Sequence, residues 1–275
     1  MGGGRTIAPH AANPIGKALS DPPVSARSFK LVVAYVGTAY QGWQVQANAP
    51  TIQAELERAW HDVTGESIRI TASGRTDSGV HALGQVVSLE STTMHSPQVI
   101  LRAINANLPD DIRILDVEEA ARGFHAIRDA VSKRYRYLIQ DGGVADPFLR
   151  GSCWYVPQRL DEQAMQKAAM TLTGTHDFAS YQTAGSPRAS TVRTILDFTV
   201  TRQSRELCDP LLIEIAADGF LYNMVRNLVG TLVEVGRGVH EVTWPKEVLE
   251  SGDRTLAGQT APPQGLILIS VEYPI

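Results

Sequence analysis

Hydrophobic side chains recur with two different periods in the first half of the chain. Between Ile52 and Val63 they fall on one face of a helix, at Ile52, Leu56, Ala59, Trp60 and Val63. A second helix begins at Ser96-Pro97, because proline is favoured in the first helical turn, and extends to about Asn105. Strand-like runs flank these helices at 30–36, 67–72, 85–89 and 112–117. The predicted order is therefore β-α-β-β-α-β.

The second half repeats this order. Strands are predicted at 131–139, 192–201, 211–216 and 266–273, with helices at 162–172 and 220–235 and a short helix at 245–249. Each half matches the split β-α-β pattern of ferredoxin-like folds. We expect an α+β protein whose two ferredoxin-like halves form one continuous mixed or antiparallel sheet, with a central cleft at the join and helices on the outer face. The expected divisions are a flexible tail at 1–28, an N-terminal half at 29–125 and a C-terminal half at 126–275.

The helix predicted at 220–235 is apolar almost all round, which marks a central, buried helix. A narrow polar stripe interrupts it at Asn223, Arg226, Asn227 and Gly230. Such a stripe usually faces water, but an arginine among apolar residues is better placed against a polar cleft or a carboxylate. We predict Asp77 as the partner of Arg226. This prediction fails if the two side chains lie on opposite sides of the fold.

The loop Ser73–Ala82 joins two predicted strands and holds Arg75 and Asp77 between two glycines. Glycine permits a tight bend, and a carboxylate presented there beside a guanidinium is a plausible reactive group. The same residue types also form ordinary turns, so the loop alone does not decide between the two interpretations.

Composition and charge narrow the classes of function. The chain has 275 residues, 43% of them hydrophobic, and a formal net charge of −4, which suits a globular protein that does not coat nucleic acid indiscriminately. Contacts to a polyanion would come from local clusters of cations. One basic stretch comprises Arg122, Arg128, Lys133, Arg134 and Arg136, and the other Arg188, Arg193, Arg202 and Arg205. One such run usually forms a solvated face, but two in an acidic chain favour an anionic partner.

Cysteine and histidine usage predicts no metal site. Cys153 and Cys208 are far apart, and the histidines lack metal-binding spacings such as HExxH. Two lone thiols fit a reducing cytosol. The longest apolar runs are too short to span a bilayer, and the first residues lack the apolar stretch of a secretory signal. We therefore expect a cytoplasmic protein.

The strand predicted at 131–139 carries different side chains on its two faces. Tyr135 and Tyr137 share one face, and Arg134 and Arg136 share the other. A tyrosine on an inward face is most often part of the core. It can also offer a flat ring on which a nucleobase stacks.

In their order and spacing, these motifs resemble the tRNA pseudouridine synthase A family (pseudouridine synthase I type). The similarity extends from about Lys30 to Tyr273 and includes GRTDSGVHA at 74–82, RYRY at 134–137, GTHDF at 174–178, GFLYNMVRN at 219–227 and PPQGL at 262–266. Several motifs in order are much more specific than one alone. A departure is Val36, where the family often has an acidic residue, outside the reactive loop.

The resemblance implies a cofactor-free isomerase that converts uridine to pseudouridine at about positions 38 to 40 in the anticodon arm of tRNA, acting as a homodimer. The target base would be flipped out of its stack. Asp77 matches the carboxylate that the family uses, either by covalent addition or by assisting glycosidic cleavage, and the sequence leaves both routes open. Arg226 would orient Asp77 and keep it ionised, Tyr135 would stack on the uracil, and Arg75 would fill the vacated space or bind the adjacent backbone.

Further residues are expected to bind the substrate. Leu266, after Gly265, would form an apolar wall that limits loss of the detached base to water. His81 belongs to the motif that carries Asp77, and it is also expected to bind the substrate. Arg134 and Arg136, with other cations of the two basic stretches, are candidates for phosphate contacts.

Three other functions compete with this interpretation. A noncatalytic RNA-binding protein could use the same scaffold, and a pseudouridine synthase could act on another RNA. A carboxylate-dependent hydrolase is disfavoured, because the sequence places no second acidic residue near Asp77 for paired acid and base chemistry.

Overall fold

A computed structural model of the chain describes residues 1, 26–185, 189–204 and 208–274. Most of the predicted tail, residues 2–25, lies outside the described residues. Arg27 and Ser28, which were assigned to that tail, are instead part of the first strand.

The first helices and strands follow the predicted order. The strands are β1 (Arg27–Tyr35), β2 (Thr71–Ala72), β3 (His81–Ser91) and β4 (Ile112–Ala120). The helices are α1 (Ile52–Thr64) and α2 (Pro97–Asn107). In α1 the predicted apolar face is buried at Ile52, Leu56, Ala59 and Trp60. Thr51 caps this helix by accepting a hydrogen bond from the backbone N–H of Ala54.

The rest of the described chain adds six strands and three helices. The strands are β5 (Ser132–Asp141), β6 (Trp154–Val156), β7 (Gly174–Asp177), β8 (Val192–Arg202), β9 (Leu211–Ala217) and β10 (Leu266–Glu272). The helices are α3 (Glu162–Met170), α4 (Met224–Gly236) and α5 (Trp244–Ser251). Single 3₁₀ turns are η1 (Gly37–Ala39), η2 (Ala179–Tyr181), η3 (Arg254–Leu256) and η4 (Pro263–Gly265).

One mixed sheet unites these strands, in the order β4-β1-β3-β10-β5-β9-β8-β7, with β2 paired to β3 and β6 to β5. The β3–β10 and β5–β6 pairs are parallel, and the other pairs are antiparallel. The expected α+β protein with one large mixed sheet is therefore confirmed.

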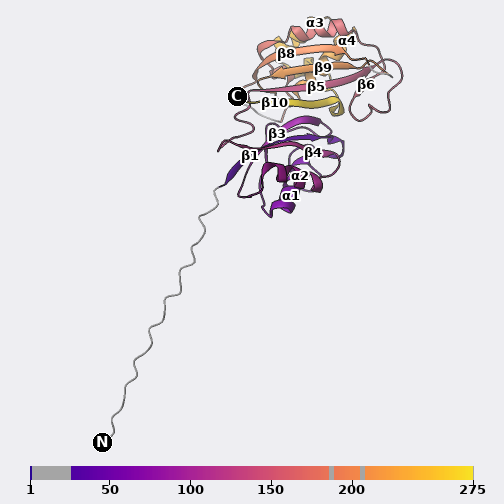
Figure 1. Ribbon diagram of the computed structural model, residues 1–275. Coiled ribbons are helices and arrows are strands. Elements are labelled where there is room, and N and C mark those ends of the chain that lie inside the picture. Colours follow the sequence, from indigo (N-terminus) through magenta and orange to yellow (C-terminus); the bar gives the residue numbers. More distant parts are fainter. Residues whose placement is uncertain (2–25, 186–188, 205–207, 275) are drawn as a thin grey trace.

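The last strand, β10, joins the two parts of the sheet. Its residues Ile267 and Leu268 pair with His81 and Ala82 of β3, and its other edge pairs with β5. In Figure 1, the N-terminal elements form one lobe, the C-terminal elements form the other, and β10 lies at their boundary. The loop before β3, which carries Asp77, is thereby brought next to elements from the end of the chain.

The core lies on the face of the sheet that carries the β5 tyrosines. Tyr137 of β5, Ile213 of β9 and Leu232 of α4 are fully buried in one apolar cluster. The predicted central helix is confirmed, because Leu228, Val229, Leu232 and Val233 of α4 are all inaccessible to solvent.

Two predicted elements were too long. The helix begins at Met224 rather than Phe220, because Asn223 has a φ of +58°, which no α-helical residue adopts. The strand predicted at 67–72 shrinks to Thr71–Ala72. Side chains of α1 form hydrogen bonds with both backbone polar groups of Ile70 instead: Glu57 accepts from its N–H, and Gln53 donates to its carbonyl. The strands β6 and β7 were missed, since they are too short to show alternation.

Candidate active site

A cavity of about 1580 Å³ opens where the loop between β2 and β3 meets the beginning of α4. Its walls include Ser73–Ser78 from the loop, Phe220–Arg226 around the start of α4, Tyr135 from β5 and Leu266 from β10. Tyr135 lies on the same strand face as Tyr137, so the cavity is on the face of the sheet that the core helices cover.

The loop that carries Asp77 is held by contacts on both sides of that residue. The backbone N–H of Trp43 donates to the carbonyl of Thr76 at 3.0 Å, and the Ser78 hydroxyl donates to the carbonyl of Tyr40 at 3.1 Å. The hydroxyls of Thr76 and Tyr35 hydrogen-bond at 2.8 Å. Burial raises the pKa of Tyr35 to about 12, so this hydroxyl stays protonated. The carboxylate is therefore presented from a fixed backbone.

Gly42 allows this support to approach closely. Its φ is +83°, and a Cβ atom there would lie 2.7 Å from the carbonyl oxygen of Thr76 and 3.1 Å from the carbonyl carbon of Asp77. A side chain at this position would push against the loop backbone itself.

Asp77 and Arg226 meet in the cavity, as the polar stripe on α4 predicts. Arg226 Nη1 donates to Asp77 Oδ2 at 3.2 Å, and the two side chains are 15% and 30% exposed. The guanidinium is also held by Nε, which donates to the carbonyl of Ala261 at 2.7 Å, and by Nη1, which donates to Asn223 Oδ1 at 3.0 Å. The carboxylate is thus charge-paired while remaining accessible from the cavity.

Tyr135 and Leu266 form an apolar wall of this cavity. Tyr135 is 8% exposed, and its ring packs edge to face on Phe220, with ring centroids 5.1 Å apart. Burial, with smaller contributions from Tyr35 and the Asp77 charge, raises the pKa of Tyr135 well above its usual value. Its hydroxyl therefore stays protonated.

Arg75 lines the same cavity and is exposed. Among the residues that the structure describes, none forms a hydrogen bond or ion pair with its guanidinium.

His81 and Gly265 lie behind the cavity wall rather than in it. His81 is 5% exposed: its Nδ1 accepts from the N–H of Gly37, and its Nε2 contacts the carbonyl of Gln264, both at 3.1 Å. Burial lowers the pKa of His81, consistent with a neutral ring. A Cβ atom at Gly265 would lie 2.5 Å from the Tyr137 ring. His81 thus joins η1 to η4, Gly265 allows η4 to approach Tyr137 of β5, and neither residue is among those that line the cavity.

Arg134 and Arg136, the candidates for phosphate contacts, are held in ion pairs outside the cavity. They lie on the other face of β5 from Tyr135, where Arg134 pairs with Asp197 at 2.8 Å and Arg136 pairs with Glu214 at 2.6 Å. Neither is among the residues that line the cavity. The Arg136–Glu214 pair joins the neighbouring strands β5 and β9, and the Arg134–Asp197 pair reaches across β9 to β8.

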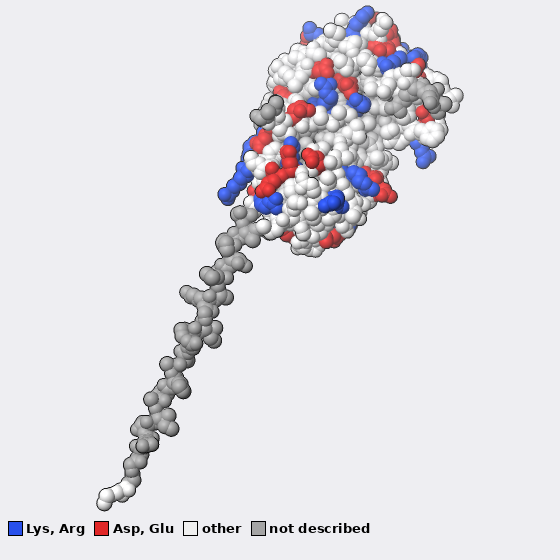
Figure 2. All heavy atoms as spheres, in the orientation of Figure 1, with Lys and Arg blue, Asp and Glu red and all other residues white. Residues whose placement is uncertain are grey.

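The two basic stretches contribute Lys133 and Arg193 to the cavity wall. Arg202 serves the fold instead, because it forms two bonds of 2.6 and 2.8 Å with the buried carboxylate of Asp141. Arg188 and Arg205 lie outside the described residues. On the face shown in Figure 2, basic and acidic side chains are interspersed and form no continuous basic surface.

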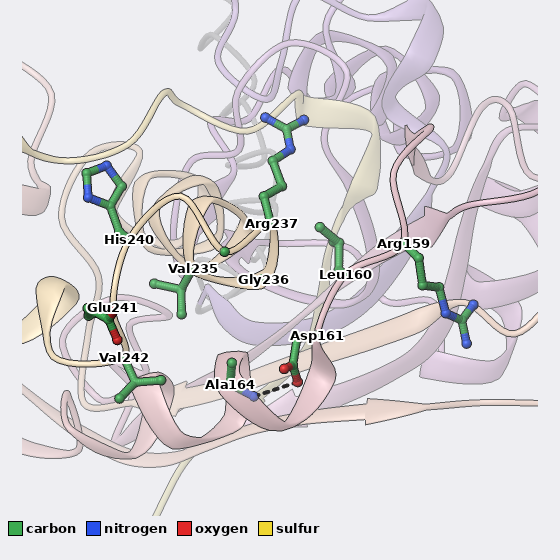
Figure 3. A pocket seen from close by; sticks show the side chains of 11 residues that line it. Arg159, Leu160, Asp161, Ala164, Val235, Gly236, Arg237, His240, Glu241 and Val242 are labelled. Atoms are coloured by element: carbon green, nitrogen blue, oxygen red, sulfur yellow. Dashed lines mark hydrogen bonds between the residues drawn. The ribbon is translucent and has the colours of Figure 1, made fainter.

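A second, smaller hollow of about 520 Å³ lies at the C-terminal end of α4. Two of its charged side chains are already engaged: Arg237 pairs with Glu234 at 2.9 Å, and Asp161 caps α3 by accepting from the N–H of Ala164 (Figure 3). Arg159 and Arg237 point in different directions in this view, so they do not converge on a ligand.

Two kinds of site are missing from the part of the chain that the structure describes. No three histidine, cysteine, aspartate or glutamate side chains there come close enough together to hold a metal ion. None of the described helices combines the length and the apolar character needed to cross a membrane.

Sequence comparison places most of the chain, including the loop with Asp77 and the helix with Arg226, in a known family. The family model described as tRNA pseudouridine synthase matches residues 31–127 and 168–274. The protein named tRNA pseudouridine synthase A in Thermoanaerobacter sp. (strain X514) is 44% identical over 247 residues, which cover 90% of this chain and 100% of the relative. The protein of the same name in Chloroflexus aurantiacus (strain J-10-fl) is 46% identical over 248 residues, which cover 90% of this chain and 89% of the relative.

Proposed function

The chain belongs to the tRNA pseudouridine synthase family, and we propose that Asp77 is the carboxylate with which it isomerises uridine in tRNA. The observation that carries this proposal is the contact between Asp77 and Arg226 inside a large, accessible cavity. A carboxylate that is paired and held by a fixed loop is ready to react without reorganisation.

The reaction is a balanced rearrangement. The bond from N1 of uracil to C1′ of the ribose breaks, and a bond from C5 to C1′ forms. The proton lost from C5 is balanced by the proton gained at N1, so the product is an isomer of the substrate. Asp77 would act either by adding covalently or by assisting cleavage of the glycosidic bond, and both routes use its carboxylate.

The other cavity residues would hold the base and its surroundings. Tyr135 and Leu266 would enclose the uracil, which limits its escape to water while it is detached. Arg75, with its guanidinium directed to no described partner, would occupy the place of the flipped base or bind the neighbouring phosphate.

The size of the cavity supports a polynucleotide substrate. Sites for small molecules usually enclose about 300–1,000 Å³, whereas this cavity has about 1580 Å³. It can therefore admit a flipped nucleotide together with the flanking backbone. Lys133 and Arg193 in its wall are suited to phosphate contacts.

The target positions, the oligomeric state and the location are proposed from the family resemblance. We propose positions 38 to 40 of the anticodon arm as targets, a homodimer as the active form and the cytoplasm as its location. We also propose that the two halves, 29–125 and 126–275, are ferredoxin-like repeats. The strand orders β4-β1-β3-β2 and β10-β5-β9-β8 support this. When the short strands β6 and β7 are left aside, each order places the first strand of its half between the third and the fourth.

Product mapping tests the choice of substrate. The full-length protein is incubated with transcribed tRNAs that carry uridine at 38, 39, 40 and elsewhere, and with a structured RNA unrelated to tRNA. Pseudouridine is then located by sequencing or mass spectrometry. The proposal predicts product at positions 38 to 40 of tRNA alone. Product mainly in the unrelated RNA would favour a synthase for another RNA, and binding without product would favour a noncatalytic RNA-binding protein.

A further inference from the structure

We infer that Asn223 is a positioning residue for this reaction, because its side-chain amide fixes Arg226 in the orientation that meets Asp77. The inference rests on the proposed function of Asp77 and extends it to a residue that does not touch the reacting carboxylate.

The contact between Arg226 and Asp77 does not fix the arginine by itself. It is a single hydrogen bond from Nη1, at 3.2 Å, rather than the two-point contact that a guanidinium can form with a carboxylate. The same Nη1 donates to Asn223 Oδ1 at the shorter distance of 3.0 Å. The amide oxygen therefore holds the nitrogen that faces the reactive carboxylate.

The backbone at Asn223 is unusual in a way that serves this contact. Its φ of +58° is in the left-handed region, which among the described non-glycine residues only Asn48 shares. Asn223 precedes the first residue of α4, yet its side chain makes no capping hydrogen bond to that helix. The amide instead contacts Arg226, so the residue occupies a strained conformation without the usual benefit of a helix cap.

The far side of the amide is also held, which sets its orientation. Asn223 Nδ2 donates to Thr183 Oγ1 at 3.3 Å, and the N–H of Thr183 donates to the carbonyl of Tyr222 at 3.1 Å. Rotating the amide by half a turn would place its NH₂ group against the guanidinium, where both groups are donors. The observed arrangement is the one that satisfies both ends.

The residue type matters for electrostatic reasons. A carboxylate at position 223 would also accept from Arg226, but it would compete with Asp77 for the same positive charge. The neutral amide accepts the hydrogen bond without adding a second negative charge. Asparagine meets this requirement and also tolerates the left-handed backbone better than most residues.

The variant Asn223→Gly tests the inference, because glycine keeps the positive φ and removes only the amide. We expect the single-turnover rate of pseudouridine formation to fall about tenfold to a hundredfold, as for a misplaced catalytic group, with little change in the dissociation constant for tRNA. The matched control is Asn48→Gly, the same substitution at an exposed left-handed residue that does not line the cavity. It should keep the full rate.

A double variant distinguishes positioning from a general structural effect. If Asn223 acts through Arg226, Asn223→Gly should cause little further loss in the Arg226→Lys background. A full multiplicative loss in that background would overturn the inference, as would a full rate for Asn223→Gly alone. If Asn223→Gly fails to fold, Thr183→Val removes the acceptor that orients the amide, and it should lower the rate with unchanged tRNA binding; an unaltered rate in that variant would likewise overturn it.

Measuring Asp77→Asn in the same assay distinguishes a failure of the proposed function of Asp77 from a failure of the proposed role of Asn223. Continued product formation by Asp77→Asn removes the proposed function and with it this inference. Loss of product by Asp77→Asn, together with a full rate for Asn223→Gly, contradicts only the role of Asn223.

Discussion

The two ends of α4 carry similar kinds of side chains but differ in how those side chains are paired. At the C-terminal end, Arg237 binds Glu234, three residues away, beside a hollow of about 520 Å³. At the N-terminal end, Arg226 binds Asp77, 149 residues away, in a cavity of about 1580 Å³. A pair between neighbours in the sequence supports the helix that contains it. The distant pair spans the two parts of the chain, which β10 joins by pairing with both β3 and β5.

Removing the arginine at the N-terminal end should have the largest effect. In Arg226→Ala the carboxylate of Asp77 loses its charge partner, and we expect the single-turnover rate to fall about a hundredfold to a thousandfold, as when another fixed electrostatic contact is removed from an active site. Quench-flow measurement of pseudouridine would test this. A rate within threefold of the wild type would mean that the pair does not act in the reaction.

Disturbing the packing behind Arg226 should have the second largest effect. A Cβ atom at Gly230 would lie 1.7 Å from the carbonyl oxygen of Gln259, in the loop whose Ala261 carbonyl accepts from Arg226 Nε. Gly230→Ala should lower the free energy of unfolding by about 1–3 kcal/mol, typical of overpacking, and should also slow the reaction. Denaturant titration and the rate assay measure the two effects. Gly238→Ala, at a glycine near the other end of α4 with open space around it, should be destabilised by its φ of +72° but should keep the rate.

Arg75 should affect binding more than chemistry. If its guanidinium meets a phosphate, Arg75→Ala should weaken tRNA binding and reduce by about one the slope of log affinity against log salt concentration. Filter binding at several salt concentrations would measure that slope. An unchanged slope together with a lost rate would indicate instead that Arg75 acts on the flipped base.

The pair at the C-terminal end of α4 should matter least. Its residues are three positions apart and partly exposed, with side-chain exposures of 26% and 20%, so Arg237→Ala should change the free energy of unfolding by about 0.5 kcal/mol or less. The reaction rate should not change. A large loss of rate in Arg237→Ala would show that the two ends of the helix are functionally linked.

The sequence predicted the parts of the site that have local signals. The glycine-bounded loop marked Asp77, and the polar stripe on an otherwise apolar helix marked Arg226 and led to its partner. Alternation along β5 correctly separated Tyr135 from Arg134 and Arg136. It does not say which face of the sheet forms the cavity, so residues from both faces were assigned to the substrate.

The remaining features depend on contacts that no local pattern reveals. The left-handed conformation of Asn223 shortens α4 and brings the amide to Arg226, but the stripe shows only that the residue is polar. The carbonyl of Ala261 is a backbone group, which any residue type provides. Side chains of α1 bind the backbone of Ile70 and prevent a longer strand there. Each of these features results from tertiary packing.

The most direct test of the account compares chemistry with binding in Asp77→Asn. The substitution removes the negative charge but keeps the size of the side chain. With tRNA labelled with tritium at C5 of uridine, isomerisation releases the label to water, because C5 loses its hydrogen when it bonds to C1′. The account predicts no release above background by Asp77→Asn, with tRNA affinity close to that of the wild type. Release at the wild-type rate would contradict it.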